Sequence, residues 1–152
     1  MIMSVHTLTT LVLIATFSAN AHSQSVMTEL QQELTKADHG IWEAVAGKHP
    51  DIPKVSAALA DDYLDIDSGT RHSRQEAIDY LKGLTNFSFE YAAARAYVLS
   101  ASSGYVIAEL TYSSVQNGTA ASGKVLTTTV FAKEHGRWIA HLHTEMDMEL
   151  DK

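Results

Sequence analysis

The chain has 152 residues and an apolar fraction of 45%, which fits one folded domain with a substantial core. Its 11 Lys and Arg stand against 18 Asp and Glu, giving a net charge of −7. The basic residues are scattered singly, so the basic stripe that phosphate binding needs is missing and nucleic acid is not an expected partner. There is no cysteine, which excludes disulfides and thiolate metal sites.

The N-terminal segment has the pattern of a secretory signal. Residues 8–17 form an apolar run of suitable length, and Ala19-Asn20-Ala21 fits the small-x-small sequence that precedes cleavage. We therefore expect residues 1–21 to be a signal peptide, residues 22–152 to be a single mature domain, and the protein to be periplasmic or secreted. The run is too short for a stable membrane span. Because residues 1–7 contain no Lys or Arg, an uncleaved tether or a cytosolic arm is the alternative.

A long helix is expected after this segment. Thr28 and Gln31 have capping-box spacing and predict where the helix begins, and Gly47 predicts its end before Pro50. Apolar residues recur every three or four positions between these signals, at Leu30, Leu34, Ala37, Ile41 and Val45. This spacing predicts one buried helical face.

Two shorter helices are expected next. Residues 53–60 suit a short helix with Pro53 in its first turn. Ser73 and Glu76 form a second capping box, which predicts a helix extending to Leu84.

Strand patterns flank and follow these helices. The expected strands comprise residues 61–67, 86–91, 105–115, 124–133 and 137–146, and residues 93–100 could either continue the second of these or pair with it. Asn117-Gly118 begins a polar loop to Gly123, which predicts a wide hairpin, whereas His135-Gly136 predicts a tight turn between antiparallel neighbours. Helices followed by antiparallel strands indicate an α+β fold. We expect a curved antiparallel sheet wrapped around the long first helix, enclosing a cone-shaped cavity for a small molecule.

Three segments carry a resemblance to a known family: residues 59–67 (LADDYLDID), 73–81 (SRQEAIDYL) and 137–144 (RWIAHLHT). Their order and spacing resemble the nuclear transport factor 2-like superfamily, in particular its SnoaL-like and ketosteroid isomerase-like bacterial members, over residues 28–148. The resemblance implies a cone-shaped α+β barrel, a pocket on the concave face and a homodimer packed through the sheet. The fold carries isomerases, dehydratases, cyclases, hydrolases and non-catalytic binding modules, so no single activity is implied.

The ketosteroid isomerase-like pattern implies a role for one aspartate. Its general base ends the segment after Ala-Asp-Asp, and this position falls on Asp67. The tyrosine that stabilises the oxyanion in that pattern lies in the first helix, where this chain has Trp42 and Glu43. The chain therefore departs from the pattern at the donor that an enolate needs.

The last strand also resembles the association domain of calmodulin-dependent kinase II. Bacterial relatives of that domain include an iota-class carbonic anhydrase group with a His-His-His-Ser-Ser run. Here the run reads His141-Leu142-His143-Thr144-Glu145, so two of its positions differ.

The same strand holds the first group of candidate site residues. His141, His143 and Glu145 alternate, so we expect them to share one strand face, with the two histidines as catalytic residues and Glu145 as a ligand-binding residue. With His72 from a nearby loop, they could form a zinc site. No fourth ligand is evident, so we favour a polar pocket wall or a subunit interface without metal.

The second group lies on the strand before the third helix. Tyr63, Asp65 and Asp67 share one face, and two carboxylates in different surroundings can provide a base for proton abstraction. Alternatively, Asp65 is solvated and Asp67 caps the Ser68-Gly69 turn. Aromatic residues complete the predicted ligand site: Trp42, Phe89, Tyr91 and Trp138.

The sequence thus predicts an exported domain that binds a small apolar molecule. Asp67, assisted by His141 or His143, would make it a cofactor-free isomerase or lyase. The alternatives are a non-catalytic ligand-binding or dimerisation domain and, less favoured, a carbonic anhydrase-like activity.

The first testable prediction concerns cleavage of the signal peptide. A chain expressed with its own N-terminus in a bacterial host should yield a mature protein that begins at His22, identified by intact mass and N-terminal sequencing of the periplasmic fraction. Ala21→Phe should block processing, because the peptidase accepts a small residue at that position. Full-length protein in the cytosol would contradict the prediction.

Overall fold

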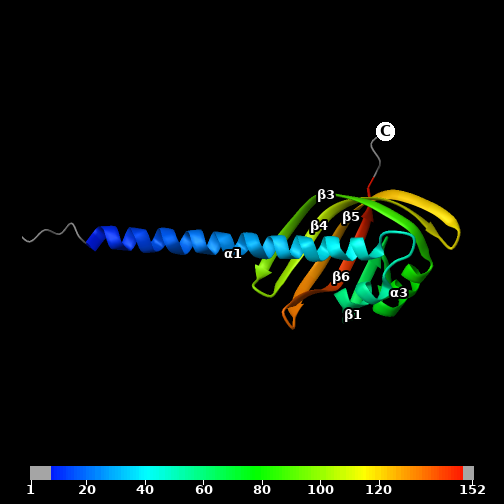
Figure 1. Cartoon of the computed structure of the whole chain (residues 1–152), viewed down its shortest axis with the longest axis horizontal. Helices are drawn as coiled ribbons and strands as arrows, with labels where there is room; N and C mark the ends of the chain where they lie inside the picture. The colour runs from blue at the N-terminus through cyan, green and yellow to red at the C-terminus, as the bar shows by residue number, and fades with distance from the viewer. Residues whose placement is uncertain (1–7, 149–152) are drawn as a thin grey trace, which may run out of the picture.

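The computed structural model describes residues 8–148, and residues 1–7 of the predicted signal peptide lie outside them. The elements in chain order are α1 Leu8–Val45, α2 Ile52–Ala58, β1 Leu59–Asp67, β2 Thr70–Ser73, α3 Arg74–Lys82, β3 Leu84–Ser100, β4 Ser103–Gln116, β5 Thr119–Glu134 and β6 Arg137–Asp147. The strands curve around the C-terminal part of α1, and the N-terminal part of α1 extends beyond them (Figure 1). Among the described residues, no helix has the length and apolar character needed to cross a membrane.

One sheet contains all the described strands, in the order β2-β1-β6-β5-β4-β3. The predicted α+β class, with a curved sheet around the first helix, is confirmed. The sheet is antiparallel, as predicted, at every pair of described strands but one, because β1 runs parallel to β6. Hairpins join β1 to β2 and link β3 through β6, which makes those pairs antiparallel; no hairpin joins β1 to β6.

The core lies between α1 and the concave face of the sheet. Leu34 of α1, Leu110 of β4 and Phe131 of β5 are almost completely buried and belong to one cluster. The predicted apolar stripe is therefore confirmed from Leu34 to Val45, whereas Leu30, with which the prediction began, does not join this cluster. The predicted helix start is wrong: the Thr28 hydroxyl donates to the Gln24 carbonyl at 2.9 Å inside the continuous helix.

The two short helices follow their capping signals. In α2, the Asp51 carboxylate accepts from the Lys54 amide at 3.1 Å, and Pro53 lies in the first turn. In α3, the capping box predicted from Ser73 and Glu76 is present. The Ser73 amide donates to Glu76 at 2.7 Å, which satisfies a helix N-terminal donor.

Two tight turns set the register of the hairpins. His135 and Gly136 have φ values of 50° and 80°, which agrees with the predicted tight turn. Asn117 and Gly118 have φ values of 49° and 84°, and Gln116 pairs directly with Thr119. This is a two-residue hairpin rather than the predicted wide loop. The small residues after Gly118 have weak strand propensity, but pairing with β4 makes them part of β5.

The second testable prediction concerns the close approach of α1 to β4. A Cβ added at Gly104 would lie 2.6 Å from Leu34 Cδ1 and 2.7 Å from the Tyr97 carbonyl oxygen. Gly104→Ala should therefore destabilise the protein by about 1–3 kcal/mol through overpacking, measured by urea unfolding.

The matched control is Gly40→Ala in α1. A Cβ at Gly40 has no neighbour within 4 Å, so alanine should instead stabilise the helix by about 0.5–1 kcal/mol. Equal effects of the two substitutions would contradict the assignment of Gly104 to a close helix–sheet contact.

Candidate functional site

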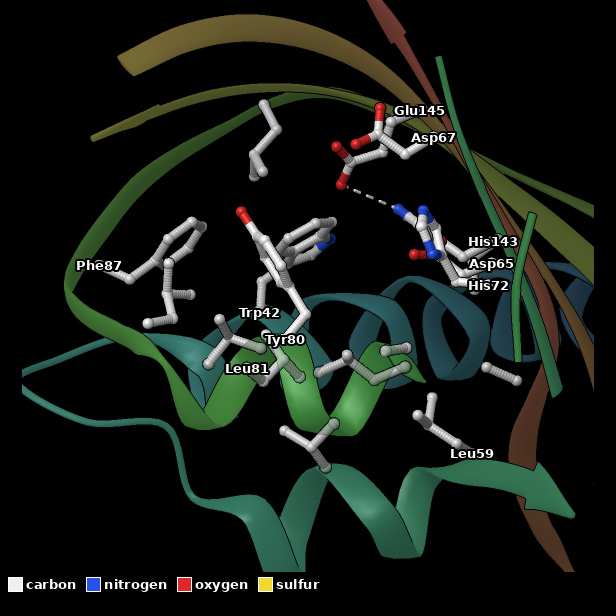
Figure 2. Close-up of a pocket in the computed structure, with 18 of the residues that line it drawn as sticks. Trp42, Leu59, Asp65, Asp67, His72, Tyr80, Leu81, Phe87, His143 and Glu145 are labelled. Atoms are coloured by element: carbon white, nitrogen blue, oxygen red, sulfur yellow. Dashed lines mark hydrogen bonds and ion pairs between the residues drawn. The ribbon is translucent and has the colours of Figure 1, made fainter. Parts of the chain in front are cut away.

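A cavity of about 340 Å³ lies between the concave face of the sheet and the helices. One part of its wall is apolar and includes Trp42, Val45, Leu59, Tyr63, Leu81 and Phe87. The polar side chains on its wall include Asp38, Asp65, Asp67, His72, His143 and Glu145. Figure 2 shows that the polar side chains gather at one end of the cavity, and that Trp42, Leu81 and Phe87 lie away from them. This composition is typical of a small-molecule site.

Strand pairing orders the polar side chains into two rows. The first row crosses four strands from β2 to β5 and reads His72, Asp65, His143, Thr129. In the second row, Asp67 of β1 pairs with Glu145 of β6. Alternation along β1 places Tyr63, Asp65 and Asp67 on the cavity face, as the sequence predicted.

His143 is the buried centre of the first row. Its Nδ1 lies 3.0 Å from the Thr129 hydroxyl and its Nε2 lies 3.2 Å from Glu145 Oε1 (Figure 2 shows the latter contact). Burial alone would lower the pKa of His143, but the hydrogen bond and charge of Glu145, together with Asp65 and Asp38, raise it overall. A raised pKa extends to higher pH the range over which the ring is doubly protonated, and in that form both ring nitrogens donate, one to Thr129 and one to Glu145.

A chain of hydrogen bonds connects His143 with α1. Thr129, the partner of His143, is also hydrogen-bonded to Asp38. The Tyr91 hydroxyl donates to Asp38 Oδ2 at 2.6 Å. Burial raises the pKa of Asp38, opposed by its bonds to Thr129 and Tyr91. Asp38 thus supports the His143 ring through Thr129.

The sequence interpretation missed Asp38 and Thr129. Asp38 does give a signal, since it lies four residues after Leu34 on the apolar face of the helix, where an unpaired carboxylate would be costly. Thr129 lies in a threonine run that resembles ordinary strand surface, and only its pairing with His143 identifies it.

Asp65 differs from the other carboxylates of the cavity. Its Oδ1 is buried and has no hydrogen-bond partner within the described part of the chain. Burial raises its pKa; His143 lowers it, and Glu145 raises it further. Asp65 lies between His72 and His143 in the row, so it is the carboxylate placed to exchange a proton inside the cavity.

His141 does not share the face of His143, so this part of the prediction is wrong. Consecutive residues of β5 pair with Ala140 and with residue 142, which makes His141 an extra residue in a β-bulge. The bulge interrupts the alternation, so Ala140 and His143 both line the cavity although they are three residues apart. His141 instead contacts carboxylates outside the cavity, with Nδ1 3.1 Å from Asp62 Oδ1 and Nε2 2.8 Å from Glu134 Oε1.

The structure divides the predicted ligand residues into two sets. Those that line the cavity are Trp42, Tyr63, Asp65 and Glu145, with Asp67 at its solvent-exposed edge. Phe89 packs behind the wall against Trp42, with ring centroids 6.5 Å apart. Tyr91 acts from outside through Asp38, and the Trp138 indole donates to Glu33 at 3.0 Å.

The predicted alternative of a zinc site has no geometric support. Across residues 8–148, no three or more His, Asp or Glu side chains are placed to hold a metal ion. The β-bulge separates His141 from His143 and removes one of the two histidines on which that alternative depended.

Comparisons with known proteins identify the fold. A family model described as SnoaL-like domain matches residues 43–146. A nuclear transport factor 2-like protein of unknown function in nutrient uptake from Rhodospirillum rubrum superposes with a TM-score of 0.70 at 15% identity, covering 76% of this chain and 98% of that one. No curated protein matches the sequence.

Two further solved structures share the fold. The association domain of calmodulin-dependent kinase II from C. elegans has a TM-score of 0.66 at 13% identity, covering 78% of this chain and 96% of its own. A ketosteroid isomerase-like protein from Erwinia carotovora atroseptica has a TM-score of 0.62 at 14% identity, covering 79% and 97% respectively. At these identities the likeness concerns the fold alone.

The third testable prediction concerns the contact between Glu145 and His143. Glu145→Gln removes the carboxylate that holds the His143 pKa high, so this pKa should fall, as measured by NMR titration of the imidazole. Because the folded pKa of His143 is raised, its stabilisation is present below the unfolded pKa and is lost as pH rises through the folded pKa. The variant should therefore lose more stability at pH 6 than at pH 9.

Glu134→Gln is the matched control, since Glu134 contacts His141 rather than His143. It should leave the His143 titration unchanged. If Glu134→Gln shifts the His143 titration as much as Glu145→Gln does, the contact with Glu145 is not the cause of the raised His143 pKa.

Proposed function

We propose that this chain, which belongs to the SnoaL-like domain family, binds a small, mostly apolar molecule and transfers a proton on it by cofactor-free acid–base catalysis. The observation that carries the proposal is the buried, unpartnered Oδ1 of Asp65 on the cavity wall beside His143. A buried polar atom without a partner has a free-energy cost. A substrate proton delivered to this oxygen would supply the missing partner.

Two opposite roles follow from the surroundings of Asp65 and His143. The Asp65 carboxylate, with a raised pKa, takes a proton from the substrate as general base. The His143 cation, oriented by Thr129, stabilises negative charge that develops on the substrate or returns a proton. Glu145 keeps the ring protonated. Such a pair suits those isomerases and lyases whose reaction begins with removal of a proton from carbon.

Asp65 is a better candidate for the base than Asp67. The Asp67 side chain is exposed and accepts a hydrogen bond from the Ser68 hydroxyl at 2.9 Å, which fits the alternative that it caps the turn. Asp65 is more buried and pairs directly with His143. His141, on the other side of the sheet, has no part in this mechanism. Export to the periplasm and a homodimer packed through the sheet remain parts of the proposal.

The experiment uses 5-nitrobenzisoxazole, a compact aromatic probe of general-base catalysis. Removal of its C3 proton breaks the N–O bond and releases a coloured cyanonitrophenolate, so one carboxylate suffices. Asp65→Asn should lower the rate by about 10²-fold, the lower end of the range for a general base. Because burial raises the Asp65 pKa, the rate should increase with pH through a midpoint above the ordinary aspartate value.

Asp62→Asn is the matched control on the same strand, since Asp62 contacts His141 outside the cavity. It should leave the rate unchanged. Loss of rate in Asp67→Asn but not in Asp65→Asn would transfer the role of base to Asp67. A rate that is unaffected by either substitution would refute acid–base catalysis at this site.

A further inference from the structure

Two carboxylates of like charge face each other at the edge of the cavity. Asp67 of β1 and Glu145 of β6 are direct neighbours in the parallel pair, and Figure 2 shows both side chains on the same side of the cavity. Like charges placed directly opposite destabilise a sheet. The arrangement therefore lowers the stability of the empty protein unless something positive lies between the two groups.

The protein supplies little positive charge to this row. His143, when protonated, is shared by two carboxylates, since it pairs with Asp65 in the sheet and its Nε2 lies 3.2 Å from Glu145 Oε1. The described residues that line the cavity include no Lys and no Arg. The protein partner of the Asp67 carboxylate is the neutral Ser68 hydroxyl. The second row therefore keeps excess negative charge facing the cavity.

Aromatic rings lie beside this charge. Tyr80 and Tyr112 line the cavity, and Tyr80 is 57% exposed, which places it at the opening. Burial raises the pKa of both phenols, and Glu145 and Asp67 raise it further. Aromatic faces next to carboxylates favour an organic cation, because each ring carries negative potential on its face.

We propose that the ligand is a protonated amine with an apolar body, its ammonium group lying between Asp67 and Glu145 and its body against Trp42 and Phe87. The position of its reacting carbon beside Asp65 rests on the function proposed for that residue. The binding of the ammonium group between Asp67 and Glu145 does not depend on that function. An amine fits better than a metal ion, because the described residues form no cluster of three or more metal-ligating groups. A carboxylate or phosphate ligand would meet the same charge with repulsion.

The test compares three probes with the same body and different head groups: cyclohexylmethylamine, cyclohexylmethanol and cyclohexanecarboxylate. Each is titrated into the full chain by calorimetry at pH 7, where the amine is protonated. The amine should bind at least about tenfold more tightly than the alcohol, and the carboxylate should not bind. Added salt should weaken amine binding and leave alcohol binding unchanged.

The Asp67→Asn variant tests the site itself. It should remove most of the preference for the amine while keeping the affinity for the alcohol, and it should raise the melting temperature of the empty protein by relieving the repulsion with Glu145. Asp62→Asn, on the same strand but outside the cavity, should change neither quantity. The rise in melting temperature also shows that the Asp67 variant folds.

Three results would overturn the inference: an alcohol that binds as tightly as the amine, a carboxylate that binds, or no amine binding at millimolar concentration. These results are independent of the benzisoxazole assay. Amine binding that depends on Asp67, without base catalysis that depends on Asp65, would retain the ligand class and reject the enzyme. Base catalysis that depends on Asp65, without a preference for the amine, would retain the proposed enzyme and reject the ligand class.

Discussion

The parallel pairing of β1 with β6 is the interaction on which the candidate site depends. It joins segments that are more than 70 residues apart in the chain and sets Asp65 against His143 and Asp67 against Glu145. No hairpin enforces this pairing, so its register depends on side-chain packing, to which α2 contributes by contacting both strands and α3 by contacting β1. A shift of one residue would turn each of these side chains to the other face of the sheet.

The bulge in β6 is the second constraint. If β6 had no bulge, strict alternation would place His141 and His143 on the same face of the strand. With it, Ala140 and His143 both face the cavity, and His141 joins an outer cluster with Asp62 and Glu134. The bulge thus gives the two histidines different surroundings: His143 is buried with two hydrogen-bond partners, and His141 is partly exposed.

The long helix contributes more than an apolar face. Asp38 is 1% exposed and lies on that face, where its charge is tolerated because Tyr91 and Thr129 donate to it. The same bonds fix Thr129 and, through it, the ring of His143. Core packing and site geometry therefore depend on the same residues, which is why a buried carboxylate persists in a position that favours leucine or alanine.

The sequence by itself determined the α+β class, the apolar face from Leu34 onward, the capping box of α3 and the cavity face of β1, because each depends on neighbours within a few residues. It also placed His143 and Glu145 on one strand face. Only the tertiary structure decided that β1 runs parallel to β6, that a bulge removes His141, and that Asp38 and Thr129 support His143. These features depend on pairing and packing between distant segments, and the local periodicity of a sequence carries no record of such partners.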